Sequence, residues 1–314
     1  MADDYSVIPA GSERPTDSTA RAPFGYYGAK LRIAQQIIRS LPLHNAWVEA
    51  FCGSAAITVG KPPAPIEVIN DRDSQIVNLF QQLRDNSEAL CSAVALTPYA
   101  REEWELARQP PTEATPLEKA RKFLVATMMT VNATFGSDRS GFSFSQSYSR
   151  ENKEARVSRW YNLPERLAKV VERLRHIRIE NRDACELVTM FSNRPATLMY
   201  LDPPYFVKRE HKYVIDANDR EFHINLLKRC LTAKCMILIS GYGNELYDEM
   251  LTKKKGWTKS TISTHTRDTK GTMYSKTEVL WKNAHFIKAY ELGRVPIRLT
   301  AKESAQNKVN PPRR

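Results

Sequence analysis

The chain has 314 residues, 42% of them hydrophobic, which is enough to bury a large core in one domain that carries an insertion. Its 47 Lys and Arg against 35 Asp and Glu give a formal net charge of +12, which favours a nucleic acid as partner before an anionic membrane surface. No apolar run approaches the roughly 18 residues of a membrane span, and the polar N-terminus is unlike a secretory signal, so we expect a cytoplasmic, DNA-associated protein without a membrane partner.

Strands and helices are predicted to alternate in the first part of the chain. Residues 1–20 have no apolar periodicity and are predicted to be a disordered tail. Apolar residues at helical spacing then predict a helix over Leu31–Leu41, followed by a buried strand at Ala46–Glu49. A second strand, Ile66–Ile69, precedes a helix over Ser74–Leu83. This alternation predicts a parallel sheet covered by helices.

The stretch 86–174 interrupts the alternation. Helical segments are predicted near Pro116–Val131 and Pro164–Leu174, on either side of a segment rich in Gly, Ser and aromatic residues, Asn132–Ser149. We therefore expect an inserted, mainly helical domain over residues 86–174.

Strand patterns return in the last part of the chain. They lie at Ile177–Ile179, Leu198–Leu201 and Met236–Ile239, with a helix predicted over Asp219–Leu231. Thr258–Thr264 and Lys276–Trp281 flank a glycine-containing loop and should pair antiparallel. The predicted fold is α/β, with a Rossmann-like, mostly parallel sheet and an antiparallel strand near the C-terminus. Its catalytic domain would combine residues 21–85 and 175–300, and residues 301–314 would form a basic tail.

The strongest motif is Asp202-Pro203-Pro204-Tyr205, which directly follows an apolar strand. It should lie at the carboxyl edge of the sheet, where open α/β proteins bind ligands. Two prolines fix the backbone and leave carbonyl oxygens free to accept, a carboxylate precedes them, and an aromatic ring follows. The alternative is a rigid turn with no role in chemistry.

An adenine amino group needs this combination, because its lone pair is delocalised into the ring until its hydrogens are held. Asp202 and the Pro203 carbonyl would accept those hydrogens while the nitrogen attacks a sulfonium methyl group. Tyr205 would stack on a base that has left the duplex. The sequence thus favours transfer of a methyl group from S-adenosylmethionine to adenine in DNA.

A second motif is the turn that follows the first strand, with Glu49, Phe51 and Gly53 as candidate cofactor-binding residues. Small residues there let a ligand approach the backbone closely. Asp71 lies 18 positions after Gly53, near the offset at which an acidic residue meets a ribose hydroxyl in Rossmann-like sheets. The alternative for Asp71 is an N-cap of the next helix.

Two further cofactor contacts are predicted on weaker grounds. Lys30 ends an aromatic and glycine segment that contains Tyr26 and Gly28, and it could pair with a methionine carboxylate. The alternative for Lys30 is a surface lysine at a helix start. Asp183 follows a strand and could accept from the adenine amino group of the cofactor, or it could cap the helix over Ala184–Phe191.

With these pieces in order, residues from Ala22 to Asn283 resemble the Dam-like (alpha-group) family of S-adenosylmethionine-dependent DNA adenine-N6 methyltransferases. The resemblance implies that Tyr26, Lys30, Asp71 and Asp202 contact the cofactor. Two departures concern glycines of the family pattern, which are replaced by Ala29 and Ala55. The resemblance also implies that the inserted domain recognises the target and that Asn132–Ser149 forms a hairpin in the DNA major groove.

Candidate DNA contacts follow from the insertion and from the segment after the proline motif. Asn132 and Arg139 are the expected base readers, with Ser140 beside them. Lys208 and Arg209 are expected to contact phosphate or to belong to a lid. In both places the alternative is an ordinary solvated loop.

Other functions remain open at this point. The same fold could methylate RNA adenine or the N4 atom of cytosine in DNA, and a DNA-binding regulator could keep it without turnover. If the chain is a site-specific DNA methylase, it could belong to a restriction-modification pair or act alone. We expect it to act on double-stranded DNA, as a monomer or a dimer. Five cysteines without a CxxC pair indicate reduced thiols, so no metal is expected.

Overall fold

The structure is a computed structural model that describes residues 5–6, 22–25, 30–31, 33–109, 113–131, 141–145, 152–204, 220–267 and 273–298. All statements below concern these residues.

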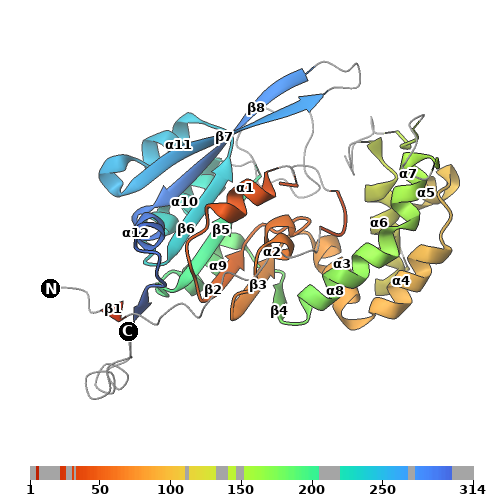
Figure 1. Cartoon of the computed structure of the whole chain (residues 1–314), viewed down its shortest axis with the longest axis horizontal. Helices are drawn as coiled ribbons and strands as arrows, with labels where there is room; N and C mark the ends of the chain where they lie inside the picture. The colour runs from red at the N-terminus through yellow and green to blue at the C-terminus, as the bar shows by residue number, and fades with distance from the viewer. Residues whose placement is uncertain are drawn as a thin grey trace.

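A seven-stranded sheet with the order β4-β3-β2-β5-β6-β8-β7 forms the centre of the molecule (Figure 1). Its strands are β2 Ala46–Glu49, β3 Ile66–Asn70, β4 Ile177–Glu180, β5 Thr197–Leu201, β6 Met236–Gly241, β7 Trp257–Arg267 and β8 Met273–Asn283. The strands from β4 to β6 are parallel, whereas β8 runs antiparallel to both β6 and β7. The predicted α/β, Rossmann-like sheet with an antiparallel strand near the C-terminus is confirmed.

Helices cover both faces of the sheet and pack against its apolar side chains. One face packs Trp47, Leu198 and Tyr200 against α1 Ala34–Arg39, α2 Ala56–Gly60 and α12 Ala284–Leu292. The other face packs Val48 and Met199 against α9 Ala184–Phe191, α10 Arg220–Thr232 and α11 Glu245–Met250. Because successive residues of a strand point to opposite faces, apolar runs with little polar alternation are buried on both sides.

The remaining helices form a second lobe beside the sheet (Figure 1). The lobe consists of α4 Ser87–Leu96, α5 Arg101–Arg108, α6 Pro116–Met128, α7 Ala155–Tyr161 and α8 Leu163–Leu174, and it packs against α3 Ser74–Asp85, which precedes it in the chain. Helices were predicted at the positions of α6 and α8, while α4, α5 and α7 were not predicted separately. A single apolar cluster joins the helices of this lobe to α3, to Ile69 of β3 and to Ile177 of β4, so the lobe packs on the sheet domain through α3 and through the strands themselves.

A buried group of charges ties the same lobe to the amino end of β3. Glu67 accepts from the Lys61 ammonium at 2.5 Å, and Arg173 of α8 donates to Glu67 at 2.8 Å and to the Thr58 carbonyl at 3.0 Å. Burial alone would raise the pKa of Glu67, but the positive charges of Arg173 and Lys61 lower it below its usual value. A charge buried this deeply is tolerated because it is paired and hydrogen-bonded.

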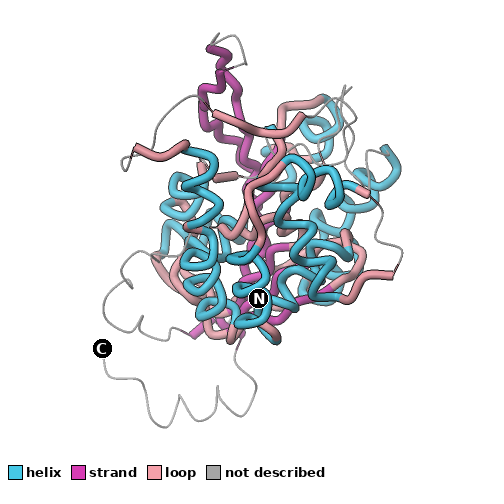
Figure 2. The backbone as a smooth tube through the Cα atoms, turned by 90° about the vertical axis from the view of Figure 1, so that its right-hand side faces the viewer, coloured by secondary structure: helices cyan, strands magenta, loops and turns pink. Residues whose placement is uncertain are grey.

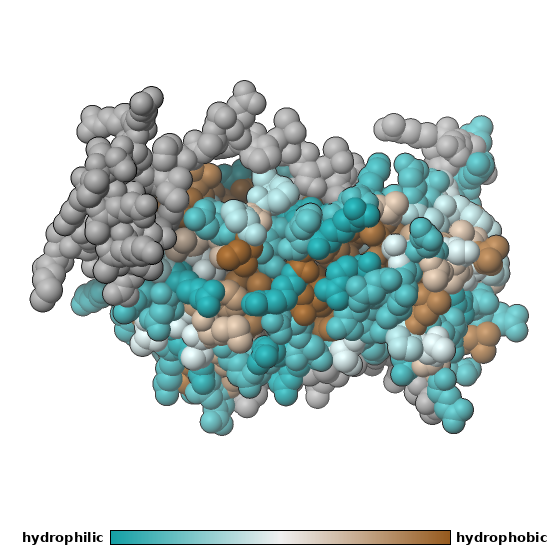
Figure 3. Space-filling view, turned by 90° about the horizontal axis from the view of Figure 1, so that it is seen from below, coloured by the Kyte–Doolittle hydropathy of each residue, from teal (hydrophilic) through white to brown (hydrophobic). Residues whose placement is uncertain are grey.

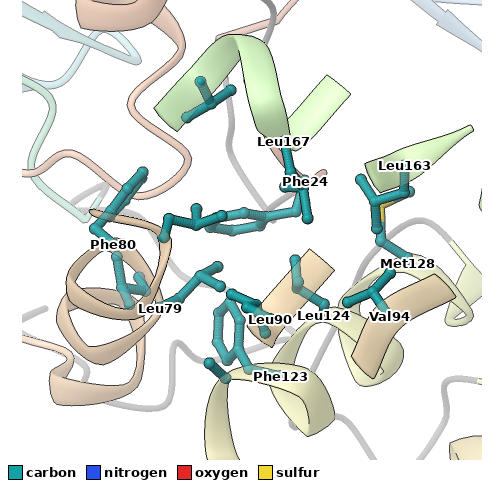
Figure 4. Packing of buried hydrophobic residues seen from close by; sticks show 14 of the residues in the cluster. Phe24, Leu79, Phe80, Leu90, Val94, Phe123, Leu124, Met128, Leu163 and Leu167 are labelled. Carbon is teal, nitrogen blue, oxygen red and sulfur yellow. The ribbon is translucent and has the colours of Figure 1, made fainter. Parts of the chain in front are cut away.

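The N-terminal segment is anchored in the helical lobe. Phe24 is fully buried among residues of α3, α6 and α8, with its ring edge-on to Phe123 at 5.3 Å between centroids (Figure 4). The guanidinium of Arg166 donates to the carbonyls of Ala22 and Pro23, each at 3.2 Å. The segment that leads to Lys30 therefore begins inside the insertion's core.

The β7–β8 hairpin is longer than predicted and extends beyond the sheet (Figures 1 and 2). Gly241, the last residue of β6, pairs with Val279, so the part of β8 before Val279 projects past the carboxyl ends of the parallel strands. Viewed from below, onto the opposite edge, hydrophilic residues are interspersed with apolar ones (Figure 3), as is usual for a solvent-facing surface.

The chain ends meet in a small separate sheet. Tyr5–Ser6 (β1) pairs antiparallel with Ile297–Arg298 (β9). The rest of the tails predicted at residues 1–20 and 301–314 lies outside the described residues. None of the described helices is long and apolar enough to cross a membrane.

The Phe24 anchor gives a stability prediction. Phe24→Ala should lower the free energy of unfolding by about 3–5 kcal/mol, because it removes a fully buried ring and leaves a cavity. Denaturant unfolding followed by circular dichroism measures the change. The control Leu96→Ala removes a side chain that is 82% exposed and should change stability by less than about 0.5 kcal/mol. Equal effects of the two substitutions would contradict the anchor.

Candidate active site

The candidate site lies where the strand order reverses, between β2 and β5. Counted from β2, the order 3-2-1-4-5 matches a Rossmann sheet, and ligands bind outside the carboxyl ends of the strands at this switch point. Glu49 ends β2 and is paired with Tyr200 in the register, two residues before Asp202. The motif that begins at Asp202 and the turn after β2 thus lie at the same edge of the sheet.

Asp202 is held by two donors on the same carboxylate oxygen. Its Oδ1 lies 2.7 Å from the Lys30 ammonium and accepts from the Ser240 hydroxyl at 3.0 Å. The Tyr200 hydroxyl lies 2.8 Å from the Ser240 oxygen. Because Ser240 has one hydrogen, which a carboxylate can only accept, Tyr200 must donate to Ser240. This chain of hydrogen bonds fixes how the carboxylate is turned.

Lys30 is buried, with a relative exposure of 6%, so the alternative of a surface lysine is wrong. Burial alone lowers the pKa of Lys30, but the charges of Asp202 and Glu278 outweigh it and raise that pKa well above its usual value. Glu278 of β8 lies 3.2 Å from the Lys30 ammonium. Lys30 is therefore charged and shared between two carboxylates.

The rest of the proline motif is only partly described. Pro203 is buried and Pro204 half-buried, and both directly follow β5 as predicted. Tyr205 lies outside the described residues, as do Tyr26, Gly28, Asn132, Arg139, Ser140, Lys208 and Arg209. Their predicted roles stay predictions.

The turn after β2 adopts left-handed backbone conformations. Gly53 has φ of 47°, and Ala55, which replaces a glycine of the family pattern, has φ of 51° and ψ of 34°. A left-handed alanine costs roughly 1–2 kcal/mol relative to glycine. The fully buried Ala55 keeps the glycine-type turn in spite of its methyl group.

Asp71 braces this turn. One carboxylate oxygen accepts from the Gly53 amide at 2.8 Å and the other from the Asp73 amide at 3.0 Å. The N-cap of α3 is Asp73, which accepts from Gln75, so the alternative of Asp71 as a helix cap is wrong. Burial raises the pKa of Asp71 to about 6, and the two backbone donors oppose that rise only in part.

Asp183 caps α9 by accepting from the Cys185 amide at 2.8 Å, which confirms the cap that was one of its two predicted roles. The side chain of Asn70 links this loop to the first turn, since it donates to the Ala50 carbonyl at 2.9 Å and to the Arg182 carbonyl at 3.1 Å. The loops that follow β2, β3 and β4 are thus bound together. A contact of Asp183 with a cofactor base stays a prediction.

Glu49 points into the interior and is bound by the start of α2. It accepts from the Thr58 amide at 3.0 Å and from the Thr58 hydroxyl, which in turn accepts from the Trp47 indole at 2.6 Å. Burial raises the pKa of Glu49 to about 8, and the charge of Asp202 adds to the rise. Phe51 lies edge-on to Phe222 of α10, at 6.3 Å between ring centroids.

The structure adds three residues that sequence reasoning missed: Tyr200, Ser240 and Glu278. Glu278 is buried in a strand that mixes polar and apolar residues, whereas Tyr200 and Ser240 are buried polar side chains that interrupt largely apolar runs. That interruption of an apolar run was the available signal. It did not say which partner each side chain would meet.

The base of the predicted recognition hairpin is antiparallel. Thr130 pairs with Phe142, the Val131 amide donates to the Gly141 carbonyl at 3.1 Å, and the Ser143 amide donates to the Met129 carbonyl at 2.7 Å. The Trp104 indole of α5 donates to the Thr130 hydroxyl at 2.7 Å. The two arms on either side of residues 132–140 are thus held against the helical lobe.

These features define a Rossmann-like α/β enzyme class, with an acidic, proline-bounded site at the switch point and an inserted helical lobe. Among solved structures, the chain is similar to a SAM-dependent methyltransferase from Agrobacterium tumefaciens, at 15% identity and a TM-score of 0.25 over 41% of this chain and 46% of that one. It is also similar to a putative RNA methyltransferase from Pyrococcus horikoshii, at 10% identity and a TM-score of 0.23 over 41% of this chain and 56% of that one. The chain thus spans about half the length of each structure.

The family comparison covers most of the sequence. The model of the D12 class N6 adenine-specific DNA methyltransferase family matches residues 26–273. The chain belongs to this family, which confirms the family predicted from the sequence. No curated protein matches the chain.

The raised pKa of Asp71 gives a prediction on cofactor binding. An ionised carboxylate accepts from ribose hydroxyls better than a protonated one, so affinity for S-adenosylmethionine should rise by about tenfold between pH 5 and pH 7. Isothermal titration calorimetry at several pH values measures this. Asp71→Asn should bind more weakly and lose that pH dependence, while the exposed control Asp85→Asn should keep it. An unchanged profile in Asp71→Asn would rule out the assigned role.

Proposed function

We propose that this chain transfers the methyl group of S-adenosylmethionine to the N6 amino group of adenine at specific sites in double-stranded DNA. The observation that carries the proposal is the placement of Asp202 and two prolines at the switch point, beside the turn of Gly53 and Ala55. Membership of the D12 class family supports the same acceptor.

The residues present fit the donor at the carboxyl edge. The left-handed turn at Gly53 and Ala55 allows close approach of a ligand to the backbone, and each oxygen of Asp71 keeps acceptor capacity beyond its one backbone bond. Phe51 follows β2 and Asp183 follows β4 at the same edge, and Glu49, whose carboxylate is bound by Thr58, ends β2. Tyr26 and Gly28 are proposed to complete the site. When bound, S-adenosylmethionine supplies a methyl group on a sulfonium cation.

The chemistry assigned to the chain is to activate a weak nucleophile. Asp202 and the Pro203 carbonyl accept the two amino hydrogens of adenine, which localises the nitrogen lone pair toward the methyl group. The ion pair with Lys30 favours the charged form of Asp202, so it acts as a hydrogen-bond acceptor during the attack. The transfer would release the donor as a neutral thioether, and the proton that the methylated nitrogen loses would pass to solvent. The ion pair supports a role of Lys30 on Asp202, ahead of the predicted pairing with the methionine carboxylate.

The proposed acceptor is a base turned out of the duplex. An adenine amino group is paired inside the helix, so it reaches a site at the sheet edge only after flipping. Tyr205 is assigned the stacking contact that holds the flipped ring, because it directly follows Pro204 in the motif. Lys208 and Arg209 are assigned contacts to the nearby phosphates.

The helical lobe over residues 86–174 is proposed as the target-recognition domain, inserted in a catalytic domain of residues 21–85 and 175–300. Its hairpin base is held in place, and Phe144 beside it is 69% exposed. Asn132, Arg139 and Ser140 lie in the segment between the two arms of that base and are assigned the contacts with the major groove.

Loss of the Asp202 charge gives the direct test. Asp202→Asn should lower the single-turnover rate of methyl transfer to unmethylated duplex DNA by about 10²–10³, because the amide is a weaker acceptor and cannot pair with Lys30. Tritiated S-adenosylmethionine, with digestion to nucleosides, measures the rate and identifies N6-methyladenine. Asp85→Asn is a matched exposed control. Label in RNA or in N4-methylcytosine would instead indicate a methyltransferase that acts on RNA or on cytosine. DNA binding without any methyl transfer would indicate a DNA-binding regulator.

The basic charge predicts how DNA binding depends on salt. With a formal net charge of +12, affinity should fall linearly on a log–log plot of association constant against salt concentration. Fluorescence anisotropy with a labelled duplex gives the slope, which reports the number of phosphates contacted. A salt-independent affinity would argue against phosphate contacts by this basic surface.

A further inference from the structure

The antiparallel strand β8 brings an acidic residue to the active site from the far end of the chain. Leu280 pairs with Ser240 and Val279 with Gly241, so Glu278 lies just beyond the carboxyl end of β6. Its side chain is buried, with a residue exposure of 6%, and its Oε1 lies 3.2 Å from the Lys30 ammonium. Because β8 runs antiparallel to β6, the residues before Val279 lie at this edge of the sheet, whereas a parallel strand would place its C-terminal residues there.

Lys30 is fixed from two sides. Its carbonyl accepts from the amides of Ile33 at 3.0 Å and Ala34 at 2.7 Å, which ties its backbone to the start of α1. Its ammonium lies between Asp202, at 2.7 Å, and Glu278, at 3.2 Å. Since a lysine stem has four rotatable bonds, Asp202 alone would leave the ammonium free to follow that carboxylate.

The single positive charge of Lys30 faces two carboxylates and is shared between Asp202 and Glu278. With Glu278 ionised, Lys30 therefore does not neutralise Asp202 completely. Asp202 keeps acceptor strength for the adenine hydrogens while its orientation stays fixed by Lys30 and Ser240.

We propose that Glu278 is a positioning residue for methyl transfer, which holds the Lys30 ammonium at Oδ1 of Asp202 so that this carboxylate meets the amino group of adenine in one orientation. Glu278 acts through Lys30 and not by touching substrate. The proposal rests on the proposed function, because it assigns a supporting residue to that same reaction.

The first test compares charge with shape. Glu278→Gln keeps the size and an acceptor oxygen but removes the charge, and it should lower the single-turnover rate of methyl transfer about tenfold. The dissociation constant for DNA and the melting temperature should stay near those of the wild type. Glu278→Asp, which keeps the charge on a shorter stem, should retain more of the rate than Glu278→Gln. The exposed Glu249→Gln is the matched control and should behave as wild type.

A double-mutant cycle separates positioning from simple structural support. If Glu278 acts through Lys30, Glu278→Gln should have almost no further effect on the rate in a Lys30→Met background. The same tenfold loss in both backgrounds would overturn the proposal, and so would a wild-type rate in Glu278→Gln. A general loss of folding would instead lower the melting temperature of Glu278→Gln and Glu278→Asp alike.

A readout without turnover separates failure of this inference from failure of the proposed function. Hydrogen exchange of the Lys30 ammonium, followed by ¹⁵N nuclear magnetic resonance, should be faster in Glu278→Gln than in wild type because one of its two carboxylate partners has lost its charge. A wild-type protein that methylates no adenine would sink the proposed function. In that case an unchanged rate of hydrogen exchange at the Lys30 ammonium in Glu278→Gln would also contradict the positioning role, whereas a faster rate would support it.

Discussion

The buried contact between Lys30 and Asp202 is the interaction on which the active site depends. Two opposite charges in a site of low polarity are stable only if both are held in good geometry, and here the supports come from distant parts of the chain. Ser240 contributes from β6, Glu278 from β8, and α1 fixes the backbone of Lys30. The antiparallel end of the sheet is therefore part of the site as well as of the fold.

Most of the sheet was predictable because its strands are short apolar runs buried on both faces. Ala46–Glu49 was predicted with the bounds of β2, and β3, β4, β5 and β6 differ from prediction by one or two residues at their ends. Helices α4, α5 and α7 were missed, since each buries at most two residues and so shows little apolar periodicity. Backbone pairing of the hairpin continues beyond the predicted arms, from His265 with Ser275 to Arg267 with Met273.

The site was predictable to the extent that parallel topology brings strand ends together. Glu49 ends a strand and Gly53, Asp71, Asp183 and Asp202 follow strands, so their common edge could be inferred before any distance was known. Pairings across the sheet could not be inferred, because they depend on register: Ser240 meets Asp202 and Glu278 meets Lys30 only through the order β5-β6-β8. The left-handed backbone of Ala55 was equally hidden, because the residue type argues against it.

If the helical lobe recognises the target, as proposed, its shared core limits how such an enzyme can acquire a new target. An exchange of residues 86–174 for those of a relative would cut through packing that includes α3 and Phe24, both outside the exchanged segment. A successful chimera would need to import the matching faces of those two elements, and the arginine that binds the Ala22 carbonyl, along with the new lobe. Evolution of specificity in this architecture should therefore proceed more readily by changes between the arms of the hairpin than by transplanting the lobe.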